Sequence, residues 1–360
     1  MMSKTEYQDI IAFHPGYYLK EIVEDMEITQ DEFAKRLNTT PKTISKLLSG
    51  QIPLSDDIAM KLSIMLGTDV DLWLNLQKKY DEKLIEIERK KELEKEKKYI
   101  SMIDYKYFVR LNVVPDVKDW EEKVRNLCKF LQISSLSVLS KEDFLVNFRN
   151  NISNPSEKNR VNSKAWLQTA INFGKQMEVA PFNKKKLIES LSAIRKLTRK
   201  HPSEFYPKLV EIFSSCGVAF VILPHLPSSG IHGAVKWINK EKVILAMNDR
   251  FKYADIFWFS LFHEIKHVLQ QKIKKTFIYN GKLDKQMEDD ADVFARDTLI
   301  PPEKYKEFLS KGVFTERAIN EFAESIEIDP CIVLGRLQKE KRVPYNRLQS
   351  IKKKYEINVG

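Results

Sequence analysis

The sequence predicts a multidomain, mainly α-helical protein with one α+β domain in its C-terminal half. Its 360 residues exceed the length of one ordinary domain, so two or three domains are expected. An apolar content of 43% is enough to build folded cores. Strand-like runs occur together between residues 217 and 247, whereas helical periodicity dominates elsewhere.

Composition argues against several classes of protein. The first residues are polar and lack the apolar run of a signal peptide. The longest apolar stretch, Ile256–Phe262, is far shorter than the ~20 residues of a membrane span. The three cysteines are widely spaced, which disfavours a disulfide framework or a cysteine zinc site. We therefore expect a cytoplasmic protein without a membrane partner. Its net charge of +10 permits a nucleic-acid partner but does not establish one.

The segment 15–77 predicts five short helices. Pro15 opens the first, whose apolar residues recur at three- and four-residue spacing. Thr29 is the expected N-cap of the second helix. After a tight turn at 38–40, Pro41 starts the third. Two short helices joined by such a turn are typical of a helix-turn-helix motif.

The third of these helices would be the one that reads DNA. Residues 1–80 hold nine Lys or Arg against twelve Asp or Glu, yet the stretch 33–55 contains no acidic residue and four basic ones. Phosphate contacts supply affinity and base contacts supply specificity. A helical docking module that touches no DNA is the alternative. The candidate DNA-binding side chains are Thr40, Lys42, Thr43, Ser45 and Lys46.

The segments HPGYYLKE, TQDEFAKRL, PKTISKLLSG and WLNLQ resemble the XRE-type helix-turn-helix of HigA-like antitoxins. The resemblance implies a five-helix DNA-binding domain over residues 1–77. It also implies a homodimer on a palindromic double-stranded DNA operator. Gln30, at the start of the second helix, would hold a phosphate, and a toxin would be a further partner.

The region between the two ends of the chain carries no motif with recognisable chemistry. Residues 78–100 are a mixed-charge run with a thin apolar seam, which favours a solvated connector helix over a long coiled coil. Residues 101–160 show apolar anchors at helical spacing. This helical middle region is either a scaffold or a sensor of an unidentified ligand.

The strongest chemical signal is the pattern H-E-x-x-H, which spans His263 to His267 in an apolar helix. The two histidines are one helical turn apart, so both rings can ligate one Zn²⁺ ion per chain. Glu264 would then be the catalytic general base of a zinc endopeptidase. A small sheet before this helix is predicted by three β-branched runs, at 217–223, 231–238 and 242–247.

A catalytic zinc ion needs a third protein ligand and one open position. No third histidine follows at the metzincin spacing, so a carboxylate of the segment 287–302 must serve. We assign Glu288 as that ligand, with Asp292 one turn further on accepting a ring N–H from one of the two histidines. The rival ligands are Asp289 and Asp290. The candidates for the oxyanion are His232 and Tyr253, with a structural role as the alternative.

The segments WFSLFHEIKHVL, EDDADVFARDTLIP and AINEFAESIEIDPCIVLGRLQKEKRVPYNRL are similar to the ImmA/IrrE family of metallopeptidases. The resemblance covers residues 161–348 and leaves 349–360 as a tail. It implies a gluzincin-like, zincin-type core that cleaves a protein partner, often a repressor. An edge strand of this fold holds the substrate backbone, and 242–248 is the candidate. The family often has Asn in place of Asp292, and either residue can hold a histidine.

Two functions follow from these observations. The first is a DNA-binding transcriptional regulator fused to a zinc-dependent endopeptidase that cleaves a regulatory protein, at rest or only after a signal. The second is an antitoxin-type repressor that binds DNA and a toxin, with the zincin domain a non-catalytic sensor or scaffold. The stretch 318–338 has a second helix-turn-helix rhythm, which favours a packed helical pair beside the cleft. A second DNA reader is the alternative there.

Overall fold

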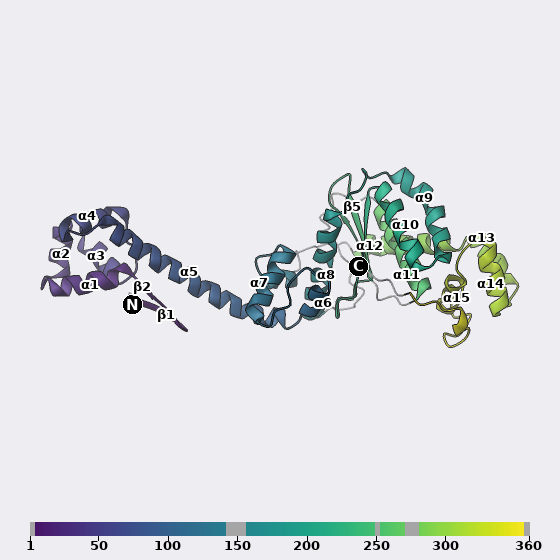
Figure 1. Ribbon diagram of the computed structural model, residues 1–360, viewed down its shortest axis with the longest axis horizontal. Helices are drawn as coiled ribbons and strands as arrows, with labels where there is room; N and C mark the ends of the chain where they lie inside the picture. Colours follow the sequence, from purple (N-terminus) through teal and green to yellow (C-terminus); the bar gives the residue numbers. More distant parts are fainter. Residues whose placement is uncertain (1–3, 142–155, 249–252, 271–280, 356–360) are drawn as a thin grey trace. The chain divides into compact units, whose positions relative to one another are not determined.

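A computed structural model describes residues 4–141, 156–248, 253–270 and 281–355, and the chain divides into two compact units, Met1–Lys97 and Lys98–Gly360. The protein is mainly helical with small sheets, as the sequence predicts (Figure 1). Among the described residues, none of the helices has both the length and the apolar character that crossing a membrane requires.

The first unit is a helical domain preceded by a two-stranded hairpin. The hairpin was not predicted, and its strands pair antiparallel with Lys4 opposite Phe13. Thr29 and Thr40 cap the second and third helices as expected, each accepting a main-chain N–H three residues on. The elements are β1 (Lys4–Tyr7), β2 (Ile10–Phe13), α1 (Pro15–Asp25), α2 (Gln30–Arg36), α3 (Pro41–Leu48), α4 (Asp56–Leu66) and α5 (Val70–Ile100).

Helix α5 is continuous for 31 residues and includes the predicted connector. Its exposed surface carries short-range ion pairs such as Lys83 to Glu86, 2.7 Å apart. The hairpin packs on this helix, because Ile10 and Ala12 form a small buried cluster with Ile87.

Helices α1 and α3 approach each other closely at Gly16. A Cβ atom placed on Gly16 would lie 2.0 Å from the carbonyl oxygen of Leu47, so only glycine fits at this crossing. His14 is almost fully buried beside it and caps α1, with Nδ1 accepting the Gly16 N–H at 3.0 Å. The contact fixes α3 against the rest of the domain.

The second unit contains the middle region, a three-stranded sheet and the helix that carries the H-E-x-x-H pattern. This helix, Ala254–Leu269, is called the metal-motif helix. Its first part comprises α6 (Tyr105–Arg110), α7 (Trp120–Leu131), η1 (Leu136–Ser140), α8 (Glu157–Gln176), α9 (Lys184–Lys196), η2 (Leu197–Arg199) and α10 (Pro202–Ser215). Its second part comprises β3 (Val218–Leu223), β4 (Gly233–Trp237), β5 (Val243–Asn248), α11 (Ala254–Leu269), α12 (Gly281–Leu299), α13 (Pro302–Ser310), α14 (Glu316–Ser325), α15 (Pro330–Lys339) and η3 (Gln349–Ile351).

The sheet has the order β3-β5-β4, with β5 parallel to β3 and antiparallel to β4. Alternate residues of β3 and β5 join the core formed with α10 and α11, while Ile244 faces Gly174 of α8 on the opposite side. The sheet therefore lies between α8 and the metal-motif helix. The prediction that 242–248 is the edge strand is wrong, because β5 has a hydrogen-bonded neighbour on each side.

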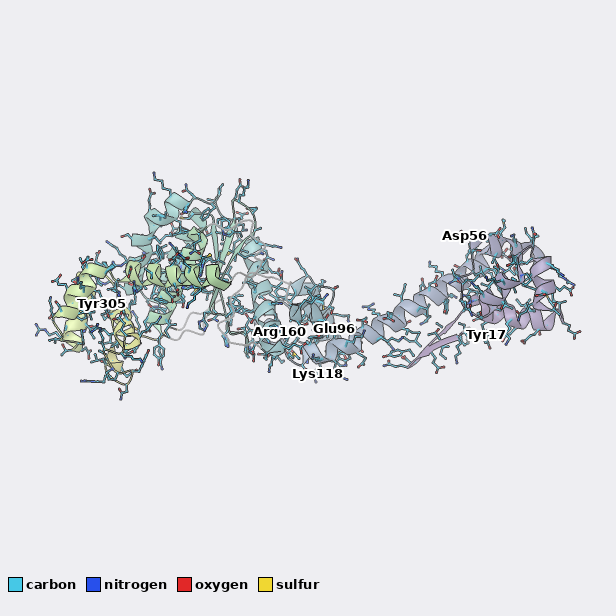
Figure 2. All side chains as sticks on the ribbon, turned by 180° about the vertical axis from the view of Figure 1, so that it is seen from behind. Tyr17, Asp56, Glu96, Lys118, Arg160 and Tyr305 are labelled. Atoms are coloured by element: carbon cyan, nitrogen blue, oxygen red, sulfur yellow. The ribbon has the colours of Figure 1, made fainter. Side chains whose placement is uncertain are left out.

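The end of the described chain is part of the core of the second unit. Trp258 of α11 donates its indole N–H to the hydroxyl of Tyr355 at 2.9 Å, and Tyr355 is buried. Lys352 pairs with Asp255 at 2.7 Å. In the same unit Tyr305 of α13, labelled in Figure 2, donates its hydroxyl to Glu340 just after α15. The expected separate tail at 349–360 is thus tied to α11 as far as Tyr355.

Candidate metal centre and nucleic-acid interface

Helix α3 presents the candidate DNA-binding face. Ile44 and Leu47 are buried in the domain core, whereas Lys42, Ser45 and Lys46 are exposed on the other side. This division follows the helical period of the sequence. The face is therefore available to a partner, and its two cations and hydroxyl suit a phosphate backbone and base edges.

The remaining candidates lie around the start of the two helices. Gln30 is exposed as the first residue of α2. Thr40 is committed to capping α3, since its oxygen accepts the Thr43 N–H at 3.1 Å and lies 2.8 Å from the Thr43 hydroxyl. Thr40 and Thr43 hence form the cap of the reading helix, with hydroxyls already engaged with each other.

Helix α11 and helix α12 bring His263, His267 and Glu288 together. One candidate ligand atom from each lies within 4.8 Å of the others. The Nε2 atoms of the histidines are 3.0 Å apart, and the Glu288 oxygens lie 3.2 Å from His263 and 3.6 Å from His267. A tetrahedral zinc ion with bonds of ~2.05 Å has ligand-to-ligand edges of about 3.3 Å. The three side chains fit that triangle, and two imidazoles with one carboxylate are a donor set suited to zinc.

The other ring nitrogen of each histidine has its own partner. Asp292 lies 2.8 Å from Nδ1 of His263, and Gln270 lies 3.0 Å from Nδ1 of His267. Such contacts hold the Nε2 atoms toward the centre of the triangle. The sequence pointed to Asp292, whereas Gln270 was missed. Its spacing of three residues from His267 on the same helix was the available signal.

Proton binding competes with metal binding at His263. Burial lowers the pKa of this ring, but hydrogen bonds to Glu288 and Asp292 and the charges of Glu264 and Glu288 outweigh it, so the pKa is raised. The rival carboxylates Asp289 and Asp290 are exposed and do not belong to the triangle of ligand atoms.

Glu264 follows His263 on α11, and its side chain lies against Gly233 of strand β4. Burial raises the pKa of its carboxyl to about 7, against the opposing charge of His263 and with a smaller contribution from Glu288. A Cβ on Gly233 would come within 2.7 Å of the Glu264 side chain, so glycine leaves room for it. A carboxyl with a pKa near neutrality can both accept and return a proton at physiological pH.

The two oxyanion candidates differ in position. His232 directly precedes Gly233, and its carbonyl accepts the Asn248 N–H at 3.1 Å. Tyr253 precedes the first residue of α11, ten residues before His263, which is about 15 Å along the helix axis. Tyr253 is therefore too far from the metal triangle to face an oxyanion there, and that assignment is wrong.

Helices α14 and α15 repeat the backbone of α2 and α3. Asn38 and Glu327 occupy the turn with positive φ values of 47° and 57°. The next N–H in each motif bonds to the carbonyl of a buried alanine, at 2.9 Å to Ala34 and 3.1 Å to Ala323. A proline then opens the second helix in both motifs.

The second motif nevertheless does not present a reading face. The positions equivalent to Lys42 and Ser45 are Cys331 and Leu334, and both are fully buried. Helix α15 packs its apolar side against α11 instead. A second DNA reader at this place is therefore excluded, and the pair supports the metal-motif helix.

Comparison with known proteins identifies the first unit. Residues 19–73 match the family model described as helix-turn-helix. Through this unit the chain belongs to the helix-turn-helix family. It is 32% identical over 83 residues to the uncharacterized HTH-type transcriptional regulator YddM of Escherichia coli, a match that covers 22% of this chain and 88% of that protein.

Two further matches carry the names of antitoxin or antidote proteins. The chain is 33% identical over 81 residues to antitoxin HigA-1 of Vibrio cholerae, covering 22% of this chain and 73% of that protein. A solved addiction module antidote protein of a HigA family from Coxiella burnetii is 30% identical, with 23% of this chain and 92% of that chain covered and a TM-score of 0.22. The HigA-like helix-turn-helix expected from the sequence is confirmed, and the metallopeptidase half stays a prediction.

Proposed function

We propose that the protein is a DNA-binding transcriptional regulator whose second unit is a zinc-dependent endopeptidase acting on a regulatory protein. The observation that carries the peptidase half is the triangle of His263, His267 and Glu288 with Glu264 beside it. The helix-turn-helix family and the exposed face of α3 support the DNA-binding half.

Each residue of the site would have a separate role in the hydrolysis of a peptide bond. His263, His267 and Glu288 would hold the zinc ion, which would supply a Lewis acid. Glu264 takes a proton from the attacking water and returns it to the leaving amine, which its pKa of about 7 suits. His232 remains the candidate for the oxyanion side. These roles define an acid–base hydrolysis that needs no covalent intermediate on the protein.

Strand β4 is the proposed support for the substrate backbone. Among the described strands it pairs with β5 alone, so its other edge can accept an extended peptide by main-chain hydrogen bonds. Gly233 of this strand touches Glu264, which would place a bound peptide next to the general base.

Metal content is the first test. Full-length protein purified with zinc should contain about one Zn²⁺ per chain by metal mass spectrometry, and Glu288→Ala should lose it. Asp289→Ala removes a neighbouring exposed carboxylate and serves as the matched control, which should keep the metal. Wild-type protein that takes up no zinc when it is offered would exclude the peptidase function.

A cleavage assay distinguishes the peptidase from a second candidate function. Glu264→Gln should keep the metal and abolish cleavage of the regulatory partner, because the amide accepts no proton. The relative named antitoxin HigA-1 favours a second candidate, a repressor that binds DNA and a toxin while the second unit acts as sensor or scaffold. If the wild type and Glu264→Gln both hold zinc and behave alike in cells, this second function is the correct one.

The DNA half has its own assay. We expect full-length protein to bind double-stranded DNA from its own promoter region as a homodimer, with affinity falling as salt rises. Lys46→Ala should reduce the slope of that salt dependence by about one. Lys20→Ala removes an exposed lysine from α1 and should leave the slope unchanged. Equal slopes for the two variants would show that α3 does not contact phosphate.

A further inference from the structure

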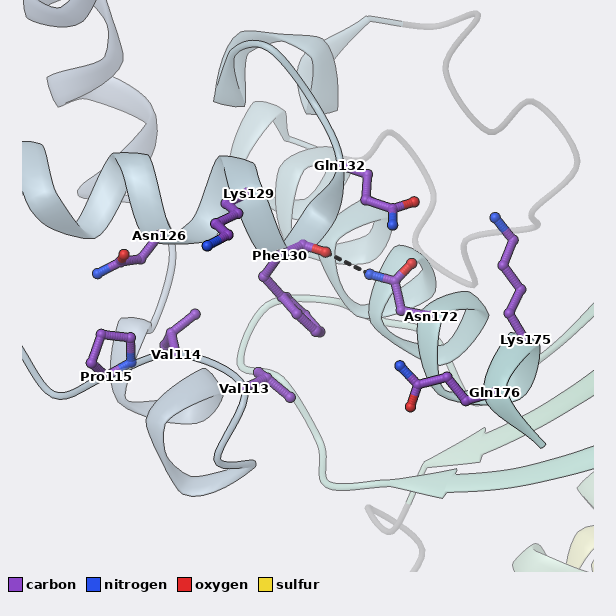
Figure 3. Close-up of a pocket in the computed structure, with 10 residues that line it drawn as sticks. All are labelled: Val113, Val114, Pro115, Asn126, Lys129, Phe130, Gln132, Asn172, Lys175 and Gln176. Atoms are coloured by element: carbon purple, nitrogen blue, oxygen red, sulfur yellow. Dashed lines mark hydrogen bonds between the residues drawn. The ribbon is translucent and has the colours of Figure 1, made fainter.

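A cavity of about 470 Å³ lies in the middle region of the second unit, away from the metal triangle (Figure 3). It is bounded by the segment 113–115, the end of α7 and the last turns of α8. Its volume lies within the ~300–1,000 Å³ typical of small-molecule sites. Neither the DNA-reading face nor the peptidase chemistry uses any residue that lines it.

One side of the cavity is apolar and contains an aromatic ring. Phe130 is partly exposed there, and its ring packs edge-on against Phe108 with centroids 6.1 Å apart. That contact supports the ring and leaves it available to stack on a flat ligand. The apolar lining residues are Val113, Val114, Pro115 and Phe130.

Amide side chains also line the cavity, and Figure 3 shows Asn172 and Gln176 on one side of the Phe130 ring. Asn172 is held in place, since it donates to the Phe130 carbonyl at 2.7 Å and accepts from Gln168 at 2.9 Å. It keeps one N–H and one lone pair for a ligand. Gln132 and Gln176 have no side-chain hydrogen bond within the described part of the chain. Amides offer a donor and an acceptor side by side, which matches the edge of a nucleobase.

The charge of the cavity is positive. None of the described residues that line it is acidic, and Lys129 of α7 and Lys175 of α8 contribute two cations from different helices. Both side chains are exposed, and neither has an ion-pair partner among the residues that the structure describes. The whole unit from residue 98 to 360 holds 45 Lys or Arg against 31 Asp or Glu, a net charge of +14. An anionic ligand is therefore favoured over a neutral or cationic one.

We infer that this cavity binds a small anion with a planar, hydrogen-bonding ring, the chemical class of nucleotides. The ring lies on Phe130, the amides read its edge, and Lys129 and Lys175, which lie on opposite sides of Phe130 in Figure 3, attract anionic groups at the two ends of the ligand. Helix α8 links the cavity to the sheet, because Gly174 lies between Asn172 and Lys175 and packs on Ile244 of β5. A ligand held by this turn of α8 thus contacts an element that packs directly on the sheet next to the metal-motif helix.

The test is calorimetric titration of the full-length protein with a panel of nucleoside mono-, di- and triphosphates and cyclic dinucleotides. Inorganic phosphate and uncharged nucleosides are included as separate probes. The variant Lys129→Gln/Lys175→Gln removes both cations and keeps exposed, helix-compatible side chains. The matched control is Lys208→Gln/Lys304→Gln, which removes two exposed lysines of α10 and α13 outside the cavity.

We expect at least one nucleotide to bind, with affinity at least tenfold weaker in the cavity variant and unchanged in the control. Phe130→Leu should weaken binding as well, since it keeps the apolar volume and removes the stacking surface. The assignment is overturned if no panel member binds at 1 mM, on the order of the weakest ligands such a site retains. It is also overturned if binding survives in the cavity variant, or if inorganic phosphate binds as tightly as any nucleotide.

Discussion

The crossing of α1 over α3 provides a sharp test of how the first unit is held together. Gly16 is buried as the second residue of α1, where alanine would gain at most the about 1 kcal/mol that it gains over glycine at an open interior position of a helix. At this place the added Cβ would lie 2.0 Å from the Leu47 carbonyl oxygen and 3.0 Å from His14 Nδ1. Gly16→Ala therefore opposes a small intrinsic gain with a large steric loss.

The magnitude follows from the contact. A carbon and a carbonyl oxygen normally stay about 3.3 Å apart, so the two helices would have to separate by roughly 1.3 Å. Overpacking costs about 1–3 kcal/mol, and a backbone carbonyl cannot rotate away as a side-chain tip can. Taking the upper end of that range, about 3 kcal/mol, and subtracting the propensity gain of about 1 kcal/mol, we expect a net loss of about 2 kcal/mol, which is a large part of the stability of a small domain.

Hydrogen exchange of the full-length protein, followed by mass spectrometry, measures this loss where it occurs. Amides of α1 to α4 should exchange roughly thirtyfold faster in Gly16→Ala, while those of the second unit stay unchanged. DNA binding should weaken in parallel, because α3 carries the reading face. Lys20→Ala, at an exposed position of the same helix, is the control. Wild-type exchange rates in Gly16→Ala would refute the packing argument.

Three further outcomes are expected. Burial lowers the pKa of His14, so the unfolded chain binds a proton more readily than the folded one. Stability of the first unit should be complete above pH ~6.5 and fall as pH drops through that value, and unfolding of His14→Asn should show less pH dependence. Gly174→Ala should cost about 1–3 kcal/mol, since its Cβ would lie 2.7 Å from Ile244, and thermal unfolding measures it. Native protein should react rapidly with a thiol reagent at Cys128 alone, because the other two cysteines are buried; three equally reactive thiols would contradict the core.

The parts predicted well from sequence are those with local signals. Each cap or helix start acts within one helical turn, as at Thr29, Thr40 and Pro41. The helix-turn-helix can therefore be predicted from consecutive residues. The metal triangle likewise depends on two local patterns. These are the four-residue spacing of His263 and His267 on α11 and the acidic residues around Glu288 on α12. The structure brings Glu288 and Asp292 to the histidines in the assigned places.

The parts that sequence reasoning missed depend on distant partners. Strand β1 is polar in sequence, and the apolar strand β2 gains its buried side from Ile87, Tyr80 and Leu84, far along the chain. The position of β5 in the sheet depends on which strands flank it, and strand composition does not encode that order. The cavity beside Phe130 lies where α7 and α8 meet, so the sequence pattern of either helix alone does not predict it.

The repeated turn of α2–α3 and α14–α15 has a consequence for substitution. In α3 Lys42 and Ser45 are exposed, so changing either residue should alter what is recognised and leave the fold intact. In α15 the equivalent Cys331 and Leu334 are core residues, so the same changes would loosen the support of α11. A saturation screen scored for folding should therefore give opposite tolerance profiles for two helices of nearly identical backbone. Substitutions in the first motif can therefore change DNA specificity without unfolding the domain. The second motif tolerates few substitutions, because its helix α15 packs against α11.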